Sequence, residues 1–131
     1  FMKKFFLLII AFISLSLSVM GQNNLPSSVV KATQNGDARS LAEGFNSSLE
    51  LILPNKSGVF SKSQAEYMMG DFFRQNAPSS FTIIHQGQRE NASFAIGKYI
   101  SSTGTYRFYF LTKNDSGKIL IHQLRIEEQN E

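Results

Sequence analysis

The 131-residue sequence contains no cysteine. The chain therefore has no disulfide, no thiolate metal site, no thiol nucleophile and no lipid attachment through an N-terminal cysteine. It also lacks a glycine-rich phosphate loop, a nucleophile elbow and a dinucleotide-binding fingerprint. The sequence accordingly predicts no cofactor.

A strong charge of one sign is also missing, with 13 basic residues against 10 acidic ones and a net charge of +3. Two of the basic residues, Lys3 and Lys4, lie in a segment that we expect to be removed. The remaining chain then has 11 basic residues against 10 acidic ones, a net charge of +1. This balance predicts no nucleic-acid partner.

Residues 1–21 have the pattern of a secretory signal peptide. Lys3 and Lys4 precede an apolar run over residues 5–17, and Val19-Met20-Gly21 has compact residues where a cleavage site needs them. The alternative is an uncleaved membrane anchor, for which the run is short, because a bilayer span needs about 20 residues. We therefore expect an exported protein, periplasmic or secreted, with no stable membrane span after cleavage.

Residues 22–131 are expected to form one domain, since about 110 residues can fold on a single core without disulfides. Pro26 opens a short helix that Gly36 ends, and Asp37 is a good N-cap for a second helix over residues 38–45. A third helix follows a capping box formed by Ser61 with Gln64 or by Ser63 with Glu66. Its apolar stripe has helical spacing and consists of Ala65, Met68, Met69, Phe72 and Phe73.

Alternating and β-branched residues predict strands over residues 49–53, 59–60, 81–86, 93–101, 105–113 and 118–126. Turns are expected at residues 54–58, 102–104 and 114–117, and a loop at residues 88–91. Gly97, in the middle of a strand, indicates a bulge or bend.

Three segments carry a resemblance to a known superfamily. They are Gly36-Asp37-Ala38 with Leu41-Ala42 and Phe45, the strand over residues 106–110, and the closing strand over residues 121–127. With this order of elements, the chain resembles the nuclear transport factor 2-like, cystatin-like α+β superfamily, and within it a branch of small exported bacterial proteins of unknown function. The resemblance implies a cone-like roll, in which one curved antiparallel sheet wraps around a long helix and two short N-terminal helices precede it. Some relatives are isomerases, dehydratases or cyclases, and others only bind or dimerise.

The inner face of such a cone is expected to carry Met68, Met69, Phe72, Phe108 and His122. These side chains either fill a core or line a pocket for a small molecule. In the last strand Leu120, His122, Leu124 and Ile126 share one face by alternation. His122 is the candidate general acid or base there, and the alternative is a hydrogen-bonded core histidine.

The opposite face of the last strands is expected to carry Tyr99, Arg107, Tyr109, Gln123 and Arg125. Arginine beside tyrosine suits a recognition surface or a subunit interface. The alternative is a solvated face on which arginine stems cover tyrosine rings. With two histidines, His85 and His122, and no carboxylate paired with them at ligand spacing, no metal site is predicted.

These observations favour a non-catalytic binding or interaction module of the cell envelope. Its partner is then an unknown small molecule, an envelope protein or a second copy bound through the open sheet face. The alternative hypothesis is a small-molecule isomerase or dehydratase that uses a cone cavity with His122 as acid or base.

Cleavage after Gly21 is the first testable prediction. Protein exported by its native host should have a mass that corresponds to a chain beginning at Gln22, because the charged and apolar segment is recognised and removed. Intact-protein mass spectrometry measures this. A mature chain that still begins near Met2 would contradict the prediction.

Overall fold

The structure is a computed structural model that describes residues 25–130. The predicted signal peptide lies outside the described residues. The elements are, in order, α2 (Ser27–Asn35), α3 (Ala38–Ala42), β1 (Phe45–Leu53), β2 (Lys56–Ser61), α4 (Lys62–Gln75), β3 (Pro78–Arg89), β4 (Ala92–Ser101), β5 (Gly104–Asp115) and β6 (Lys118–Gln129). The predicted α+β class is confirmed.

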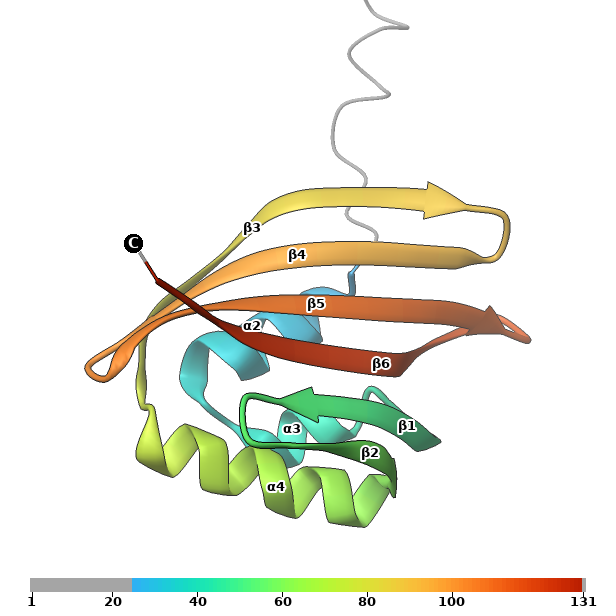
Figure 1. Ribbon diagram of the computed structural model, residues 1–131. Coiled ribbons are helices and arrows are strands. Elements are labelled where there is room, and N and C mark those ends of the chain that lie inside the picture. The colour runs from blue at the N-terminus through green and yellow to red at the C-terminus, as the bar shows by residue number, and fades with distance from the viewer. Residues whose placement is uncertain (1–24, 131) are drawn as a thin grey trace, which may run out of the picture.

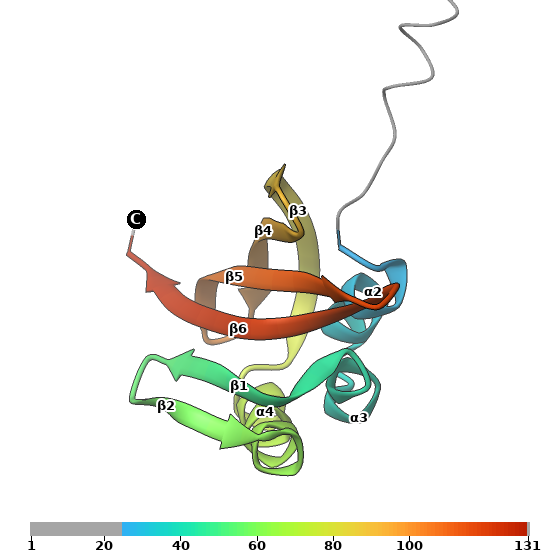
Figure 2. The ribbon, with the colours of Figure 1, turned by 90° about the vertical axis from the view of Figure 1, so that its right-hand side faces the viewer.

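The strands form one six-stranded sheet in the order β2-β1-β6-β5-β4-β3. Neighbouring strands are antiparallel except β1 and β6, which are parallel. The sheet is curved, with α2 behind β5 and β6 and with α4 beneath β1 and β2 (Figures 1 and 2). This is the predicted cone-like roll around a long helix, preceded by two short helices.

Both short helices begin where the sequence predicts. Gly36 ends α2 with a left-handed φ of 64°, and the Asp37 side chain caps α3 by accepting a hydrogen bond from Ser40 N. The predicted end of the second helix at Phe45 is wrong, because α3 stops at Ala42 and Phe45 opens β1. Phe45 pairs with Ile121 of β6 and is buried there, so strand pairing overrides the helical spacing.

The apolar face of α4 packs beneath the sheet. The capping box that forms is the one of Ser61 with Gln64. The side chains of Ala65, Met69, Phe72 and Phe73 are buried, as their helical spacing predicts. Phe72 is the central contact, with its ring centroid 5.2–5.9 Å from the rings of Tyr106, Tyr99 and Phe108.

The strands of the second half are longer than predicted. β3 continues through the expected loop at residues 88–91, and only Glu90 and Asn91 form a turn. The irregularity expected at Gly97 is in the partner strand, where the register slips between Ile83 and His85. Gly97 itself accommodates Phe81, since a Cβ at this position would lie 2.3 Å from the Phe81 ring.

A buried junction at Asn76 joins the end of α4 to the β4–β5 hairpin. The Asn76 side-chain amide donates to Phe72 O at 3.1 Å. Its carbonyl oxygen Oδ1 accepts from the Tyr106 hydroxyl at 3.0 Å and from the Thr103 hydroxyl. The Tyr99 hydroxyl donates to the backbone oxygen of Asn76. Helix and hairpin are therefore fixed relative to each other by polar contacts as well as by ring packing.

Replacing Phe72 with alanine tests the packing of α4. Phe72→Ala should lower the free energy of unfolding by about 3–5 kcal/mol, because it removes the ring that three core aromatics contact. Tyr67→Ala on the same helix is the control, since Tyr67 is 74% exposed. Chemical denaturation measures both variants. Equal effects of the two substitutions would show that α4 does not pack through Phe72.

Candidate functional site: the open face of the sheet

The side of β4, β5 and β6 away from the helices is a candidate contact surface. On β5 the side chains of Tyr106, Phe108 and Phe110 are buried, so the residues between them point outward. We call the outward side of these three strands the open face. It carries Arg107, Tyr109, Leu111, Gln123 and Arg125, all half-buried. Figure 1 turns this face to the viewer, and no described helix crosses it.

Arg125 and Tyr109 form the centre of the open face. They are directly opposite each other across the β5–β6 pair, and the Arg125 guanidinium carbon lies 4.3 Å from the centroid of the Tyr109 ring. Arg125 Nε also lies 3.4 Å from a carboxylate oxygen of Glu127. A cation over an aromatic ring contributes about 0.5–1 kcal/mol at an exposed site. The Tyr109 ring and the Glu127 carboxylate thus favour this position of the guanidinium before anything binds.

Gln123 is held in place by β1, the strand that flanks β6 on the side opposite β5. It lies opposite Glu50 in the parallel pairing of β1 and β6, and its amide donates to the Glu50 carboxylate. Its partner across β5 is Leu111. The open face therefore combines arginine, tyrosine and amide groups that already have defined positions.

The neighbouring strand β4 adds apolar side chains that the sequence analysis did not include in the surface. Phe94 and Ile100 are 40% and 37% exposed, and Ile96 lies between them opposite Tyr109. Alternation places them on the face opposite Ala95 and Tyr99, and the burial of these two residues therefore turns them outward. Apolar side chains beside arginine and tyrosine are typical of interaction surfaces.

The predicted place of Tyr99 on the open face is wrong. Tyr99 is fully buried, stacks on Phe108 with ring centroids 4.7 Å apart, and donates its hydroxyl to Asn76 O. The reason is the length of the β4–β5 turn. The turn has two residues, 102 and 103, so Tyr99 lies opposite Tyr106. A three-residue turn over residues 102–104, as predicted, pairs Tyr99 with Arg107 instead.

The predicted place of His122 on the inner face is also wrong. The register of β5 and β6 slips here, since Leu111 pairs with Gln123 but Thr112 pairs with Ile121, which leaves His122 in a bulge. Ile121 is buried in place of His122 and Leu120. The His122 Nε2 atom is 3.5 Å from a carboxylate oxygen of Asp115, which belongs to the outward side of β5.

The other predicted pocket residues do not form one site with His122. Met69, Phe72 and Phe108 belong to the hydrophobic core, where Phe108 contacts the rings of Phe72, Tyr99, Phe81 and Phe110. Met68 lines a different space, between β2 and α4. The arrangement needed for His122 to act as acid or base inside the cone is therefore not present.

Residues 25–130 contain neither a grouping of side chains typical of a metal site nor a membrane-spanning helix. Among residues 25–130, no three His, Asp or Glu side chains are grouped so that they could hold a metal ion. His85 instead packs beside the Phe94 ring at 5.6 Å. None of the helices in this range is long and apolar enough to cross a membrane.

Comparisons with known proteins give a family and a fold. A family model described as "Domain of unknown function (DUF4783)" matches residues 26–127. The crystal structure of a DUF4783 family protein from Bacteroides ovatus is similar, at 31% identity and a TM-score of 0.79, over 84% of this chain and 100% of that chain. One from Bacteroides uniformis has 32% identity and a TM-score of 0.78, over 82% and 100%. No curated protein matches.

A more distant structure agrees in fold alone. A nuclear transport factor 2-like protein of unknown function from Shewanella baltica has 13% identity and a TM-score of 0.61, over 80% of this chain and 88% of that chain. The nuclear transport factor 2-like fold that the resemblance implies is therefore confirmed.

The buried position of Tyr99 gives a prediction about alkaline pH. Burial, and secondarily the neighbouring Tyr106, raises the pKa of Tyr99 well above its usual value of 10.0. The unfolded chain then loses this proton at a lower pH than the folded protein does. The free energy of unfolding contributed by Tyr99 is complete below about pH 10 and decreases as the pH rises further.

Tyr99→Phe should therefore have two effects. It should lower the free energy of unfolding by about 1–3 kcal/mol at pH 7, because Asn76 O loses its buried donor. It should also make the loss of stability above about pH 10 shallower than in the unsubstituted protein. Urea denaturation between pH 7 and pH 11 measures both. Tyr109→Phe on the open face is the control, and an equal response of the two variants would contradict the buried position.

Proposed function

The chain belongs to the DUF4783 family, whose domain has no known function, and we propose that it is a non-catalytic interaction module whose contact surface is the open face. The observation that carries the proposal is the ordered pair of Arg125 and Tyr109 on a face that no described helix covers. Arginine and tyrosine commonly contribute most of the binding energy of protein interfaces. Side chains that are already ordered lose less conformational entropy on binding.

The occupant that best fits the open face is a second copy of the chain. Arg107 has no ion-pair partner among residues 25–130, and it lies directly opposite Glu127 across the β5–β6 pair. A two-fold axis parallel to these strands, placed between them, brings β5 of one copy over β6 of the other. Arg107 of each copy then faces Glu127 of the other copy. The face is thus complementary in charge to itself, as an isologous interface requires.

The apolar residues of β4 complete this surface. Phe94, Ile96 and Ile100 extend the open face beyond the arginine–tyrosine centre, and their burial in a dimer would remove apolar surface from water. Apolar patches that are exposed on a monomer commonly mark interaction sites. With the axis between β5 and β6, β4 of one copy lies over β1 of the other, so the dimer uses β1 as well as β4, β5 and β6.

We place this module in the cell envelope on the strength of residues 1–21. The charged and apolar pattern of this segment supports export, and the absence of cysteine makes folding independent of disulfide formation in that compartment. The protein is accordingly proposed to be periplasmic or secreted.

Removing both arginine anchors tests the contact surface. The double variant Arg107→Ser/Arg125→Ser should raise the dissociation constant of the dimer by at least about tenfold, because each arginine loses its contacts across the interface. The melting temperature of the monomer should change by no more than a few degrees, since neither side chain belongs to the core. Sedimentation equilibrium and a thermal melt measure the two quantities.

A matched control carries the same change of charge on the helix side. Arg39→Ser/Arg74→Ser removes two arginines from α3 and α4 and should leave the dimer unchanged. A monomeric unsubstituted protein would overturn the dimer, and equal association of both double variants would place the contact surface elsewhere. An unfolded Arg107→Ser/Arg125→Ser variant would show that these arginines are structural.

A further inference from the structure

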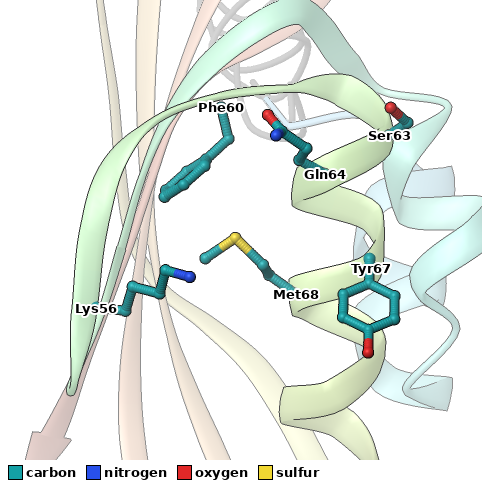
Figure 3. Close-up of a pocket in the computed structure, with 6 residues that line it drawn as sticks. All are labelled: Lys56, Phe60, Ser63, Gln64, Tyr67 and Met68. Carbon is teal, nitrogen blue, oxygen red and sulfur yellow. The ribbon is translucent and has the colours of Figure 1, made fainter.

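A groove between the edge strand β2 and helix α4 lies on a different part of the molecule from the open face. Its volume is about 340 Å³, and it is lined by Lys56, Phe60, Ser63, Gln64, Tyr67 and Met68. Figure 3 shows the Lys56 ammonium, the Phe60 ring and the Met68 thioether pointing toward one another inside it. This volume lies at the lower end of the range of small-molecule sites. We call it the edge groove.

Local sequence forms the two walls. Lys56, Gly58 and Phe60 alternate along β2 and therefore share one side of the strand. Gln64 and Met68 are one turn apart on α4, so they share a face of the helix. Helix α4 begins at Lys62, directly after β2 ends at Ser61, and runs back along the strand (Figure 1). The groove is thus built from one continuous segment, residues 56–68.

Gly58 determines how the Phe60 ring lies. A Cβ at Gly58 would be 3.1 Å from the tip of the Phe60 ring and 3.3 Å from the next ring carbon. The ring therefore lies back over the strand, into the space that a side chain at Gly58 would need. In this position its centroid is 5.9 Å from Lys56 Nζ. Ring and ammonium form one surface of the groove.

The one charged group that lines the edge groove is a cation, Lys56. Lys56 forms no ion pair with any residue in the range 25–130, and no acidic side chain lines the groove. The Gln64 side-chain oxygen accepts from the Ser61 backbone N–H at 3.0 Å and from the Ser61 hydroxyl at 3.1 Å. This capping box orients the amide and keeps the Gln64 Nε2 group as a donor at the groove. A cation and an amide donor together suit an anion.

The remaining walls are apolar. Phe60 and Met68 are only partly buried by the core, and the Tyr67 ring at the rim is 74% exposed. Aromatic rings and a thioether bind flat apolar groups well, because their contact area is large and methionine adapts its shape. The edge groove is therefore apolar along its sides and positive at one point.

We propose that the edge groove binds a small monocarboxylate with an aromatic body. Its carboxylate pairs with Lys56 Nζ and accepts a hydrogen bond from Gln64 Nε2. Its ring packs against Phe60 and Met68, with Tyr67 at the rim of the groove (Figure 3). This site rests on no part of the interaction proposed for the open face, and the two sites lie on different strands of the sheet.

Titration with phenylacetate tests the proposal, with phenylacetamide as a neutral probe of nearly equal shape. In ¹⁵N-labelled protein, phenylacetate up to about 10 mM should give saturable shifts of amide resonances confined to residues 56–68. Phenylacetamide should bind at least about tenfold more weakly, because it lacks the charge that Lys56 recognises. Equal affinity of the two compounds, or shifts outside this segment, would overturn the site.

Two variants separate the charge from the shape of the groove. Lys56→Met keeps the length of the side chain but removes its charge, and should weaken phenylacetate binding at least about tenfold. Gly58→Ala displaces the Phe60 ring and should weaken both compounds. Lys118→Met, at the exposed start of β6, is the matched control and should bind as the unsubstituted protein does.

A thermal melt of each variant shows whether it is folded. The melting temperature of Lys56→Met should remain close to that of the unsubstituted protein. Unchanged phenylacetate affinity in folded Lys56→Met would overturn the role of the cation. Equal weakening by Lys56→Met and Lys118→Met would show that only the overall charge matters, and would also overturn the site. Absence of saturable binding would do the same.

Discussion

The junction at Asn76 is the contact on which the arrangement of helix and sheet depends. Asn76 follows the last residue of α4, and its oxygens accept hydrogen bonds from the hydroxyl groups of Tyr99, Thr103 and Tyr106. These three residues come from both strands of the β4–β5 hairpin and from its turn. Buried polar groups must be satisfied, and this geometry satisfies them only when the helix end meets the hairpin at one position. Phe72 therefore packs against Tyr99 and Tyr106 in one relative position of the helix and the hairpin.

The pairing of the β4–β5 hairpin also determines which of its side chains enter the core and which lie on the contact surface. With a two-residue turn, Tyr99 and Tyr106 point under the sheet together, and Arg107 and Lys98 point outward together. Helix α2 lies behind β5 and β6 and contacts β3, and α4 packs against β1 and β2 (Figures 1 and 2). The other side of β4, β5 and β6 therefore keeps its arginine, tyrosine and apolar side chains accessible. The proposed dimer follows from this division. It uses side chains that the fold leaves outside its core.

The edge groove has a different physical origin from the open face. The edge groove exists because β2 is an edge strand of the sheet and α4 follows β2 without a connecting loop. Here α4 runs back along β2, and the groove lies between the two, with the Phe60 ring resting over Gly58 as part of its wall (Figure 3). Interaction through the open face and ligand binding in the edge groove are therefore separable. The first depends on the centre of the sheet, and the second on its edge.

The sequence by itself determined the features that depend on local chemistry. The caps at Gly36, Asp37 and Ser61, the buried stripe of α4, the outward position of Arg107 and Tyr109, and the α+β class all follow from conformational preference and periodicity. Tertiary structure alone decided the sides taken by Tyr99 and His122 and the end of α3. A strand has a period of two, so one residue more or less in a turn or bulge moves a side chain to the opposite face. The number of residues in a turn or bulge is set by the pairing between strands. His122 is an example, because it lies between the Leu111–Gln123 and Thr112–Ile121 pairs and has no partner of its own on β5. No local sequence pattern specifies this pairing.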